Sequence, residues 1–293
     1  MMTTEIKTVG VAGSGTMGAG IAIVAARAGF PTIVYDTDAA ALARARGETE
    51  GFFAQSVKRG KLTSEAVERI LGSLKGTTDI GALGACDIVI EAVFEDLAVK
   101  HDLLGRLARV CPPHAIFASN TSTLSITEIA AGSGRDERCV GMHFCLPAQL
   151  MKLVEMSPGL RTSEDTFEQA WKFCLAMGQV PVRTKDNPGF ILNYFLVPLN
   201  NDAIRMVEAG VAEPADIDRA LKAALGYAMG PLELLDLVGL DTHLRVAEAL
   251  YAATREPRAA VPALVKRMIA AGHLGRKTGR GFYSYSGSAM FGG

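Results

Sequence analysis

Three glycines near the start of the chain have the spacing of a dinucleotide-binding turn. Gly13, Gly15 and Gly18 form the pattern G-x-G-x-x-G, in which the first makes a tight turn, the second lets the backbone approach a pyrophosphate, and the third lets a helix pack closely on a strand. The helix that follows offers N-terminal N–H groups to phosphate. Asp36 ends the next apolar run, where a carboxylate binds the ribose hydroxyls and repels a 2′-phosphate. These residues predict NAD as the cofactor; the alternative is a glycine-rich connection that binds no ligand.

A histidine and a glutamate in two successive apolar runs could form a general base. His143 lies at the end of the run 139–144, and Glu155 lies in the run 151–156. Two neighbouring strands would bring the carboxylate to the imidazole, fix the tautomer of the ring and raise its basicity. Such a pair takes a proton near neutral pH; the alternative is a structural histidine beside a partly exposed glutamate. The other histidines lie in helical or loop surroundings and are interpreted as structural: His101, His114, His243 and His273.

Polar residues follow several apolar runs, as a cleft at one edge of a parallel sheet would require. They are Asp36, Glu95, Asn120, Ser122 and His143. Because ligands bind at the carboxyl ends of parallel strands, we expect these side chains to line one site. Ser122 has an alternative role, since one residue among Ser122, Thr123 and Ser125 is expected to cap a following helix. Asn193, on a later helix, could equally be a packing or surface residue.

The elements that position these residues alternate between strand-like and helix-like runs up to about residue 187. We expect strands at 6–11, 32–35, 86–93, 115–119, 139–144, 151–156 and 180–184, and a long helical pair from Asp38 to about Leu71 that breaks at Gly60. The alternation predicts a mostly parallel sheet with helices on both faces. Asp186–Gly189 is a strong breaker, and helical segments follow it, with one short strand at 282–283. We therefore predict an α/β, Rossmann-like NAD-binding domain over 1–187 and an all-α domain over 188–293, whose spare apolar faces favour a homodimer.

Size and composition exclude several classes of protein. The chain has 293 residues, 49% hydrophobic and 21% charged, with a net charge of −1, so we expect a globular protein that binds neither nucleic acid nor a membrane surface. No apolar stretch reaches transmembrane length, and no secretory signal fits. The five cysteines lack the spacing of a metal site. We therefore expect no metal, reduced and mostly buried thiols, and a cytoplasmic protein.

A series of motifs runs along nearly the whole chain. In order they are the glycine turn, 91–95, 119–122, 143–144, 151–155, 186–193, 229–234 and 275–283. Together they resemble the L-3-hydroxyacyl-CoA dehydrogenases, especially the short bacterial 3-hydroxybutyryl-CoA dehydrogenases. The resemblance implies reversible, NAD-dependent oxidation of an L-3-hydroxyacyl-CoA, of short chain length, to the 3-ketoacyl-CoA. It also implies a Rossmann-like domain, a helical domain that dimerises, and a cleft between them.

The resemblance also implies a role for each candidate residue. His143 would be the general base for the 3-hydroxyl proton, Glu155 would orient it and stabilise the imidazolium, and Ser122 and Asn193 would hydrogen-bond substrate oxygens. The implied cofactor contacts come from the glycine turn, the strand ends and two lysines: Gly13, Ser14, Gly15, Thr16, Met17, Gly18, Asp36, Glu95, Lys100, Asn120 and Lys277. The basic bend at Lys58 implies contacts to the phosphates of coenzyme A, because that ligand is polyanionic.

Three positions depart from the family pattern. Leu146 stands where the family has an asparagine that supports the catalytic site, which affects the expected rate or substrate range. Tyr194 replaces an arginine, so an ionic contact between the domains is not expected here. Gly51 replaces a serine that binds coenzyme A in some relatives. These departures leave the chemistry in place and allow an unusual acyl group.

Two other functions stay open at this stage. A relative acting on a free hydroxy acid would share the sheet and the helical domain, but the basic residues Lys58, Arg59 and Lys61 argue against it. A nucleotide-binding protein without turnover, structural or redox-sensing, is favoured only by Leu146. Formation of NADH from NAD and 3-hydroxybutyryl-CoA separates these functions.

Overall fold

The computed structural model describes residues 6–285, and the chain divides into two compact units. Unit 1 is Met1–Asn187 and unit 2 is Pro188–Gly293. Unit 1 holds an eight-stranded sheet with the strand order β3-β2-β1-β4-β5-β6-β7-β8. The strands are β1 (Val9–Ala12), β2 (Thr32–Tyr35), β3 (Leu74–Thr77), β4 (Ile88–Glu91), β5 (Ile116–Ser119), β6 (Cys139–Phe144), β7 (Leu153–Pro158) and β8 (Val180–Arg183). All neighbours run parallel except β6 and β7, which are antiparallel, and this confirms the predicted Rossmann-like, mostly parallel sheet.

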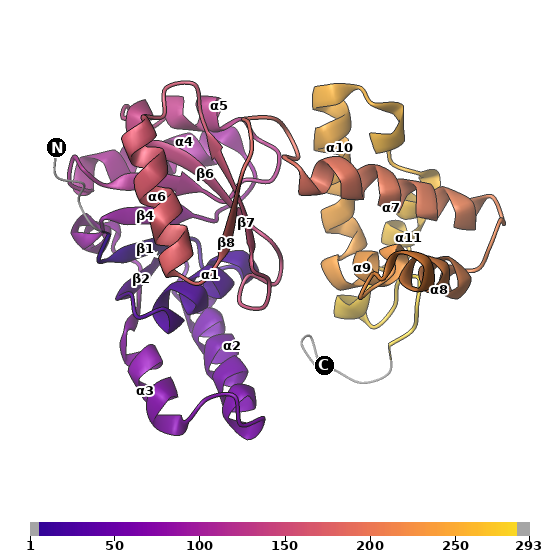
Figure 1. The fold of residues 1–293 in the computed structure, drawn as a ribbon, viewed down its shortest axis with the longest axis horizontal. Helices are drawn as coiled ribbons and strands as arrows, with labels where there is room; N and C mark the ends of the chain where they lie inside the picture. Colours follow the sequence, from indigo (N-terminus) through magenta and orange to yellow (C-terminus); the bar gives the residue numbers. More distant parts are fainter. Residues whose placement is uncertain (1–5, 286–293) are drawn as a thin grey trace. The chain divides into compact units, whose positions relative to one another are not determined.

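Helices cover both faces of this sheet (Figure 1). They are α1 (Thr16–Arg27), α2 (Ala39–Lys58), α3 (Ser64–Gly72), α4 (Leu97–Val110), α5 (Ile126–Ala131) and α6 (Glu164–Ala176), with short 3-10 helices at Ile80–Ala85 and Asp136–Arg138. Successive strand residues point to opposite faces. Ile88 and Ile90 therefore join the core under α1 and α6, while Val89 joins the core under α4 and α5. The two cores fix the carboxyl ends of the strands relative to one another.

The edge strand β3 is the one element of the sheet that the sequence did not predict. Lys75 and Gly76 interrupt its apolar pattern, and these two residues are exposed because β3 lies at one edge of the sheet. The predicted helical pair is confirmed as α2 and α3, and Gly60 between them has a φ of +66°. The short strand expected at 282–283 is wrong; that region forms only isolated bridges, Gly275 to Arg280 and Arg280 to Ser284.

Unit 2 is helical, as predicted. Its helices are α7 (Leu192–Glu208), α8 (Pro214–Leu225), α9 (Pro231–Val238), α10 (Leu240–Thr254) and α11 (Ala263–Ala270), with short 3-10 helices at Pro257–Ala259 and Arg276–Thr278. Pro214 and Pro231 each occupy the first turn of a helix, where the missing N–H group has no intrahelical partner to lose. Ile204, Leu232 and Val265 are fully buried in the core that holds these helices together.

All five cysteines are free and buried, in agreement with the sequence analysis. Burial raises the pKa of the Cys139 thiol to about 11 and that of Cys145 to about 12, so these thiols stay protonated and unreactive near neutral pH. Across residues 6–285, no helix has the length and apolar character needed to span a membrane.

Candidate active site at the carboxyl edge of the sheet

The turn between β1 and α1 leaves room for a ligand beside its backbone. Gly13 has a φ of +101°, and a Cβ there would lie 2.6 Å from the Ala92 carbonyl oxygen, so only glycine fits. A Cβ on Gly18 would overlap the Gly13 carbonyl, whereas a Cβ on Gly15 would meet no atom within 4 Å among the described residues. Gly15 is also the N-cap of α1, where no side chain within residues 6–285 caps the helix. The open space and the N–H groups of the first turn suit the pyrophosphate of a dinucleotide.

Asp36 lies immediately after β2, beside this turn. The backbone N–H and the hydroxyl group of Ser14 both donate to its Oδ2 atom, each at 2.7 Å. Burial raises the pKa of Asp36, but the hydrogen bonds from Ser14 and from the backbone N–H of Asp38 outweigh burial and leave that pKa below its usual value. An ionised carboxylate is thus held next to the glycine turn, as ribose binding requires.

His143 and Glu155 lie directly opposite each other on the antiparallel strands β6 and β7. The Nδ1 atom of His143 is 2.9 Å from Oε2 of Glu155. The histidine is 7% exposed and the glutamate 1%. The sequence predicted that neighbouring strands would bring these groups together, and the register confirms it. The contact fixes the orientation of the ring, and a carboxylate at this place favours the tautomer that carries its proton on Nδ1.

Asn120 ties the end of β5 to the neighbouring strands. Its Oδ1 atom accepts a hydrogen bond from the backbone N–H of Phe144 at 2.9 Å, and its own N–H donates to the carbonyl oxygen of Glu91 at 2.9 Å. The sequence assigned Asn120 to the cofactor. In the structure its amide oxygen also holds the backbone next to His143.

Ser122 follows β5 in a loop that Glu95 holds in place. The backbone N–H of Ser122 donates to Oε1 of Glu95 at 2.8 Å. The helix cap that the sequence placed among three residues falls to Ser125, whose hydroxyl accepts from the N–H of Glu128 at the start of α5. Among residues 6–285, no hydrogen bond engages the Ser122 hydroxyl. Ser122 is therefore not the cap of the helix that follows it.

Lys100 is buried against two acidic side chains, which the sequence did not indicate. It lies in the first turn of α4 with 1% exposure, and its Nζ atom contacts Glu91 at 2.8 Å and Glu95 at 3.3 Å. The resemblance implied a contact to the cofactor, and the structure adds that the ammonium group lies between two carboxylates. Sequence reasoning also missed Glu91, which it treated only as part of a buried strand.

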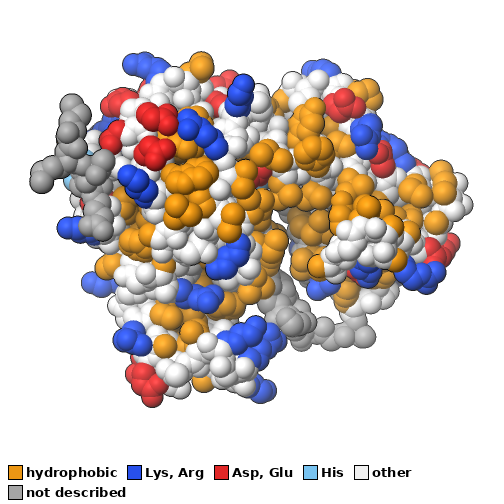
Figure 2. Space-filling model, viewed as in Figure 1, with side chains coloured by type: hydrophobic (Ala, Val, Ile, Leu, Met, Phe, Trp, Pro, Cys, Tyr) orange, Lys and Arg blue, Asp and Glu red, His pale blue; other side chains and the backbone are white. Residues whose placement is uncertain are grey.

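The basic residues at the end of α2 are exposed and close together in the chain. Within residues 6–285, Lys58, Arg59 and Lys61 form no ion pair with a carboxylate. Figure 2 shows several Lys and Arg side chains over the end of the arm that α2 and α3 form. Their charge is available for an anionic ligand.

Two of the candidate residues belong to unit 2. Asn193 lies half-buried in the first turn of α7, and its N–H donates to the Gly189 carbonyl oxygen at 3.1 Å. Lys277 donates from Nζ to Oδ1 of Asp241. Burial raises the pKa of Asp241, but this hydrogen bond and the lysine charge lower it below its usual value. Both residues thus take part in local hydrogen bonds within unit 2.

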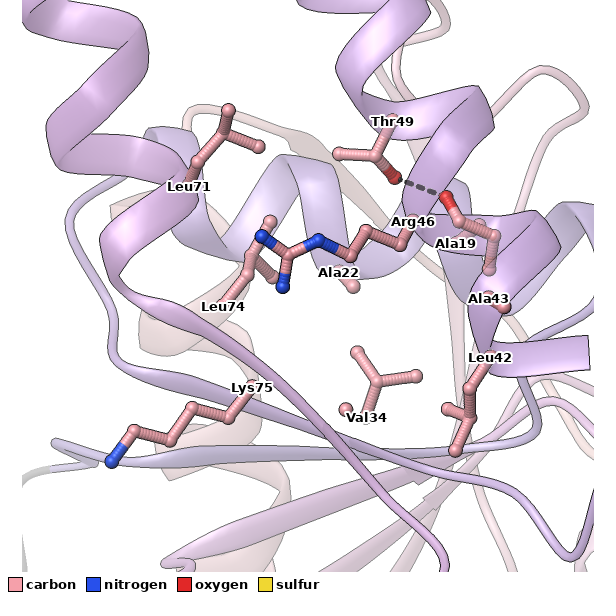
Figure 3. A pocket seen from close by; sticks show the side chains of 12 residues that line it. Ala19, Ala22, Val34, Leu42, Ala43, Arg46, Thr49, Leu71, Leu74 and Lys75 are labelled. Atoms are coloured by element: carbon pink, nitrogen blue, oxygen red, sulfur yellow. Dashed lines mark hydrogen bonds between the residues drawn. The ribbon is translucent and has the colours of Figure 1, made fainter. Parts of the chain in front are cut away.

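A cavity that the sequence did not indicate lies under the edge strand of unit 1. It measures about 220 Å³ and is lined by apolar residues of α1, α2, α3, β2 and β3, with Arg46 and Lys75 among its walls (Figure 3). Arg46 contacts Glu50 at 2.8 Å. The volume of the cavity is below the range of typical ligand pockets, and none of the residues that line the cavity is a candidate for chemistry.

No group of three His, Cys, Asp or Glu side chains in residues 6–285 forms a metal site.

Comparisons with known proteins agree with this geometry. A family model described as "3-hydroxyacyl-CoA dehydrogenase, NAD binding domain" matches residues 8–187, and one described as "3-hydroxyacyl-CoA dehydrogenase, C-terminal domain" matches residues 189–285. The chain is 45% identical to the 3-hydroxyadipyl-CoA dehydrogenase of Escherichia coli over 97% of its own length and 60% of that protein. It is 42% identical to the 3-hydroxybutyryl-CoA dehydrogenase of Mycobacterium tuberculosis H37Rv, over 97% of this chain and all of that one. The crystal structure of M. tuberculosis FadB2 superposes with a TM-score of 0.94 at 42% identity, covering 97% of this chain and 100% of that one.

Proposed function

The chain belongs to the 3-hydroxyacyl-CoA dehydrogenase family, a group of NAD-dependent oxidoreductases, and on that premise we propose that His143 is the general base of its reaction. The proposed reaction oxidises the 3-hydroxyl group of a short-chain L-3-hydroxyacyl-CoA to a ketone, and runs in reverse with the imidazolium as acid. The observation that supports it is the contact of 2.9 Å between Nδ1 of His143 and the buried carboxylate of Glu155.

This contact supports a separate task for each ring nitrogen. With the Nδ1 proton held against Glu155, Nε2 is the atom that takes the hydroxyl proton from the substrate. The carboxylate then stabilises the imidazolium that forms. Bound NAD supplies the hydride acceptor. The turn from Gly13 to Gly18 and the carboxylate of Asp36 would hold it, since both the open space beside Gly15 and the charge of Asp36 fit a dinucleotide without a 2′-phosphate.

The substrate class follows from charge and from relatives. The exposed cations Lys58, Arg59 and Lys61 would bind the phosphates of coenzyme A. Ser122 and Asn193 would donate hydrogen bonds to substrate oxygens near the reacting carbon. A relative that this chain matches over nearly all of both lengths is named a 3-hydroxybutyryl-CoA dehydrogenase, and this favours a short acyl group.

We further propose that two copies of the chain pair through unit 2, and that the enzyme is cytoplasmic. A cavity of about 450 Å³ in unit 2 is lined by Tyr194, Phe195 and Tyr227 among others, and these aromatic side chains are largely exposed. Hydrophobic side chains are also visible on the surface of unit 2 in Figure 2. Clustered exposed aromatic side chains of this kind are typical of protein–protein interfaces, and a second copy would bury them. Five free cysteines favour a reducing compartment.

A substitution of the base tests the proposal directly. His143→Ala should lower kcat for NADH formation from NAD and 3-hydroxybutyryl-CoA by roughly 10²-fold or more, with the Kd for NAD unchanged. His114→Ala is the matched control, because His114 also contacts a carboxylate, Asp87, at 3.2 Å, but does so away from the strand ends that form the site. A His143→Ala enzyme with undiminished kcat would contradict the assignment.

The choice of coenzyme A ester over free hydroxy acid has its own test. Replacing Lys58, Arg59 and Lys61 by glutamine should raise KM for the CoA ester and leave kcat unchanged, since the cations bind the substrate equally before and during the reaction. Free 3-hydroxybutyrate serves as the control substrate. An unchanged KM for the ester, or turnover of the free acid at a comparable rate, would favour the alternative function.

A further inference from the structure

Glu91 is a fully buried charged residue at the carboxyl end of β4, with 0% exposure. Its two carboxylate oxygens accept from Nζ of Lys100 at 2.8 and 2.9 Å, and one of them also accepts from the hydroxyl of Ser119. The backbone N–H of Val93 donates to the second oxygen at 3.3 Å. Buried ion pairs contribute little to stability compared with apolar residues of the same volume. The position of this pair beside the site therefore calls for an explanation other than stability.

Lys100 connects Glu91 to a second carboxylate. Its Nζ atom lies 2.8 Å from Glu91 and 3.3 Å from Oε2 of Glu95. The side chain is 1% exposed, although it belongs to the first turn of α4. Because the ammonium group of Lys100 is held against the buried carboxylate of Glu91, it provides a fixed positive charge for the carboxylate of Glu95. The position of Glu95 therefore depends on Glu91.

Glu95 in turn holds the loop that carries Ser122. Its Oε1 atom accepts from the N–H and hydroxyl of Thr123 at 3.0 and 3.1 Å, the hydroxyl of Thr121 at 2.6 Å, and the N–H of Ser122 at 2.8 Å. Burial raises the pKa of Glu95, but the Lys100 charge and these donors outweigh burial and lower that pKa below its usual value. One ionised oxygen thus fixes the backbone on both sides of Ser122.

We infer that Glu91 is a positioning residue for Ser122, acting through the buried ammonium of Lys100 and the carboxylate of Glu95. The inference rests on the proposed function, in which the Ser122 hydroxyl contacts the substrate. Ser119, which donates to Glu91 from the end of β5, belongs to the same hydrogen-bond network. Glu91 itself touches neither substrate nor cofactor, and its effect on the reaction is the placement of one hydroxyl group.

A double-mutant cycle at saturating NAD tests this coupling. Ser119→Ala removes the hydrogen bond to Glu91, and also the one that the Ser119 hydroxyl accepts from the N–H of Thr121 at 3.2 Å, without leaving a buried charge unpaired. It should lower kcat/KM for 3-hydroxybutyryl-CoA by about 3- to 10-fold. In the Ser122→Ala background the same substitution should cost less than about twofold, because the hydroxyl that it displaces is already absent. Ser133→Ala is the matched control, since Ser133 is equally buried in unit 1 and donates to the Ala130 carbonyl oxygen; it should change kcat/KM in neither background.

A second variant removes the ion pair as a whole. Glu91→Leu combined with Lys100→Met leaves no unpaired buried charge, so the melting temperature should stay near that of the wild type. Its kcat/KM should fall roughly 10- to 100-fold because Ser122 is misplaced. Three outcomes would each overturn the inference. The first is a wild-type kcat/KM in this double variant, and the second is a loss confined to KM for NAD. The third is an equal loss from Ser119→Ala with and without the Ser122 hydroxyl. If Ser122→Ala alone leaves kcat/KM unchanged, the proposed contact of Ser122 with substrate fails instead.

Discussion

Replacing Glu155 by glutamine and by leucine separates two contributions that this carboxylate makes to His143. Glutamine keeps an oxygen that accepts from Nδ1 but loses the charge, whereas leucine loses both. The 2.9 Å contact lies between side chains that are 7% and 1% exposed, so water screens it little. Because the imidazolium forms only during the reaction, both substitutions should act on kcat and not on the KM of the CoA ester.

The expected magnitudes follow from the strength of the contact. A hydrogen bond to a charged group contributes about 1.5–3 kcal/mol and one between neutral groups about 0.5–1.5 kcal/mol. Glu155→Gln should therefore lower kcat by about 5- to 12-fold, and Glu155→Leu by roughly 10- to 150-fold. The assay is the initial rate of NADH formation from 3-hydroxybutyryl-CoA at saturating NAD, with circular dichroism to confirm the folded fraction.

Glu164→Gln is the control for the loss of a carboxylate from unit 1. Glu164 is exposed and pairs with Arg183 at 3.2 Å, away from the carboxyl edge of the sheet, so its substitution should leave kcat unchanged. The reasoning is refuted if the folded leucine variant keeps kcat within about twofold of the wild type, or if glutamine and leucine lower it equally.

Four further predictions concern other parts of the chain. Ser122→Ala should lower kcat/KM by roughly 10- to 150-fold without changing the melting temperature, because Ser125 is the helix cap; a lower melting temperature with normal kinetics would contradict this. Leu146→Asn should raise kcat by about fivefold, the equivalent of one net hydrogen bond near the base, and an unchanged rate would show that this position does not limit turnover. Gly76→Ala should raise the free energy of unfolding in urea by about 0.4–1 kcal/mol, because alanine reduces the conformational freedom of the unfolded chain. In the folded chain the new Cβ would meet Leu42 at an ordinary 3.5 Å beside the cavity of unit 1. A lower free energy of unfolding would contradict this prediction. Burial lowers the pKa of His243 from 6.5 to about 4. As the pH falls from 6.5 to about 4, the unfolded chain is protonated at this histidine before the folded chain is, so the free energy of unfolding falls by up to about 3 kcal/mol. His243→Gln should reduce this loss in urea titrations at successive pH values, and an unaltered pH dependence would refute the prediction.

The sequence was sufficient for features that depend on local pattern. Alternating apolar runs gave the parallel strands, and the glycine spacing gave the turn between β1 and α1. The approach of His143 to Glu155 could also be predicted, because the two apolar runs lie on either side of a turn at Pro147. In each case, residues that are close in the chain or in successive strands determine the contact.

The features that the sequence missed depend on long-range burial. A glutamate and a lysine separated by one turn and the start of a helix are usually exposed, so nothing in the local pattern indicated that Glu91 and Lys100 would be buried together. Their burial follows from the packing of α4 against the sheet, which closes over the end of β4. A charged residue inside an otherwise apolar strand was the one available signal, because a charge there needs a buried partner.

Two sets of hydrogen bonds converge on the proposed reacting groups, and Asn120 joins them. One set is the pair His143 and Glu155, and the other runs from Glu91 to Ser122. Asn120 donates from its backbone to the carbonyl of Glu91 and accepts at Oδ1 from the N–H that follows His143. The imidazole of His143 and the backbone around Ser122 are thus held by carboxylates before any ligand binds. Such preorganisation is most effective where charge develops during a reaction, which explains why the buried carboxylates lie behind the reacting groups and not among them.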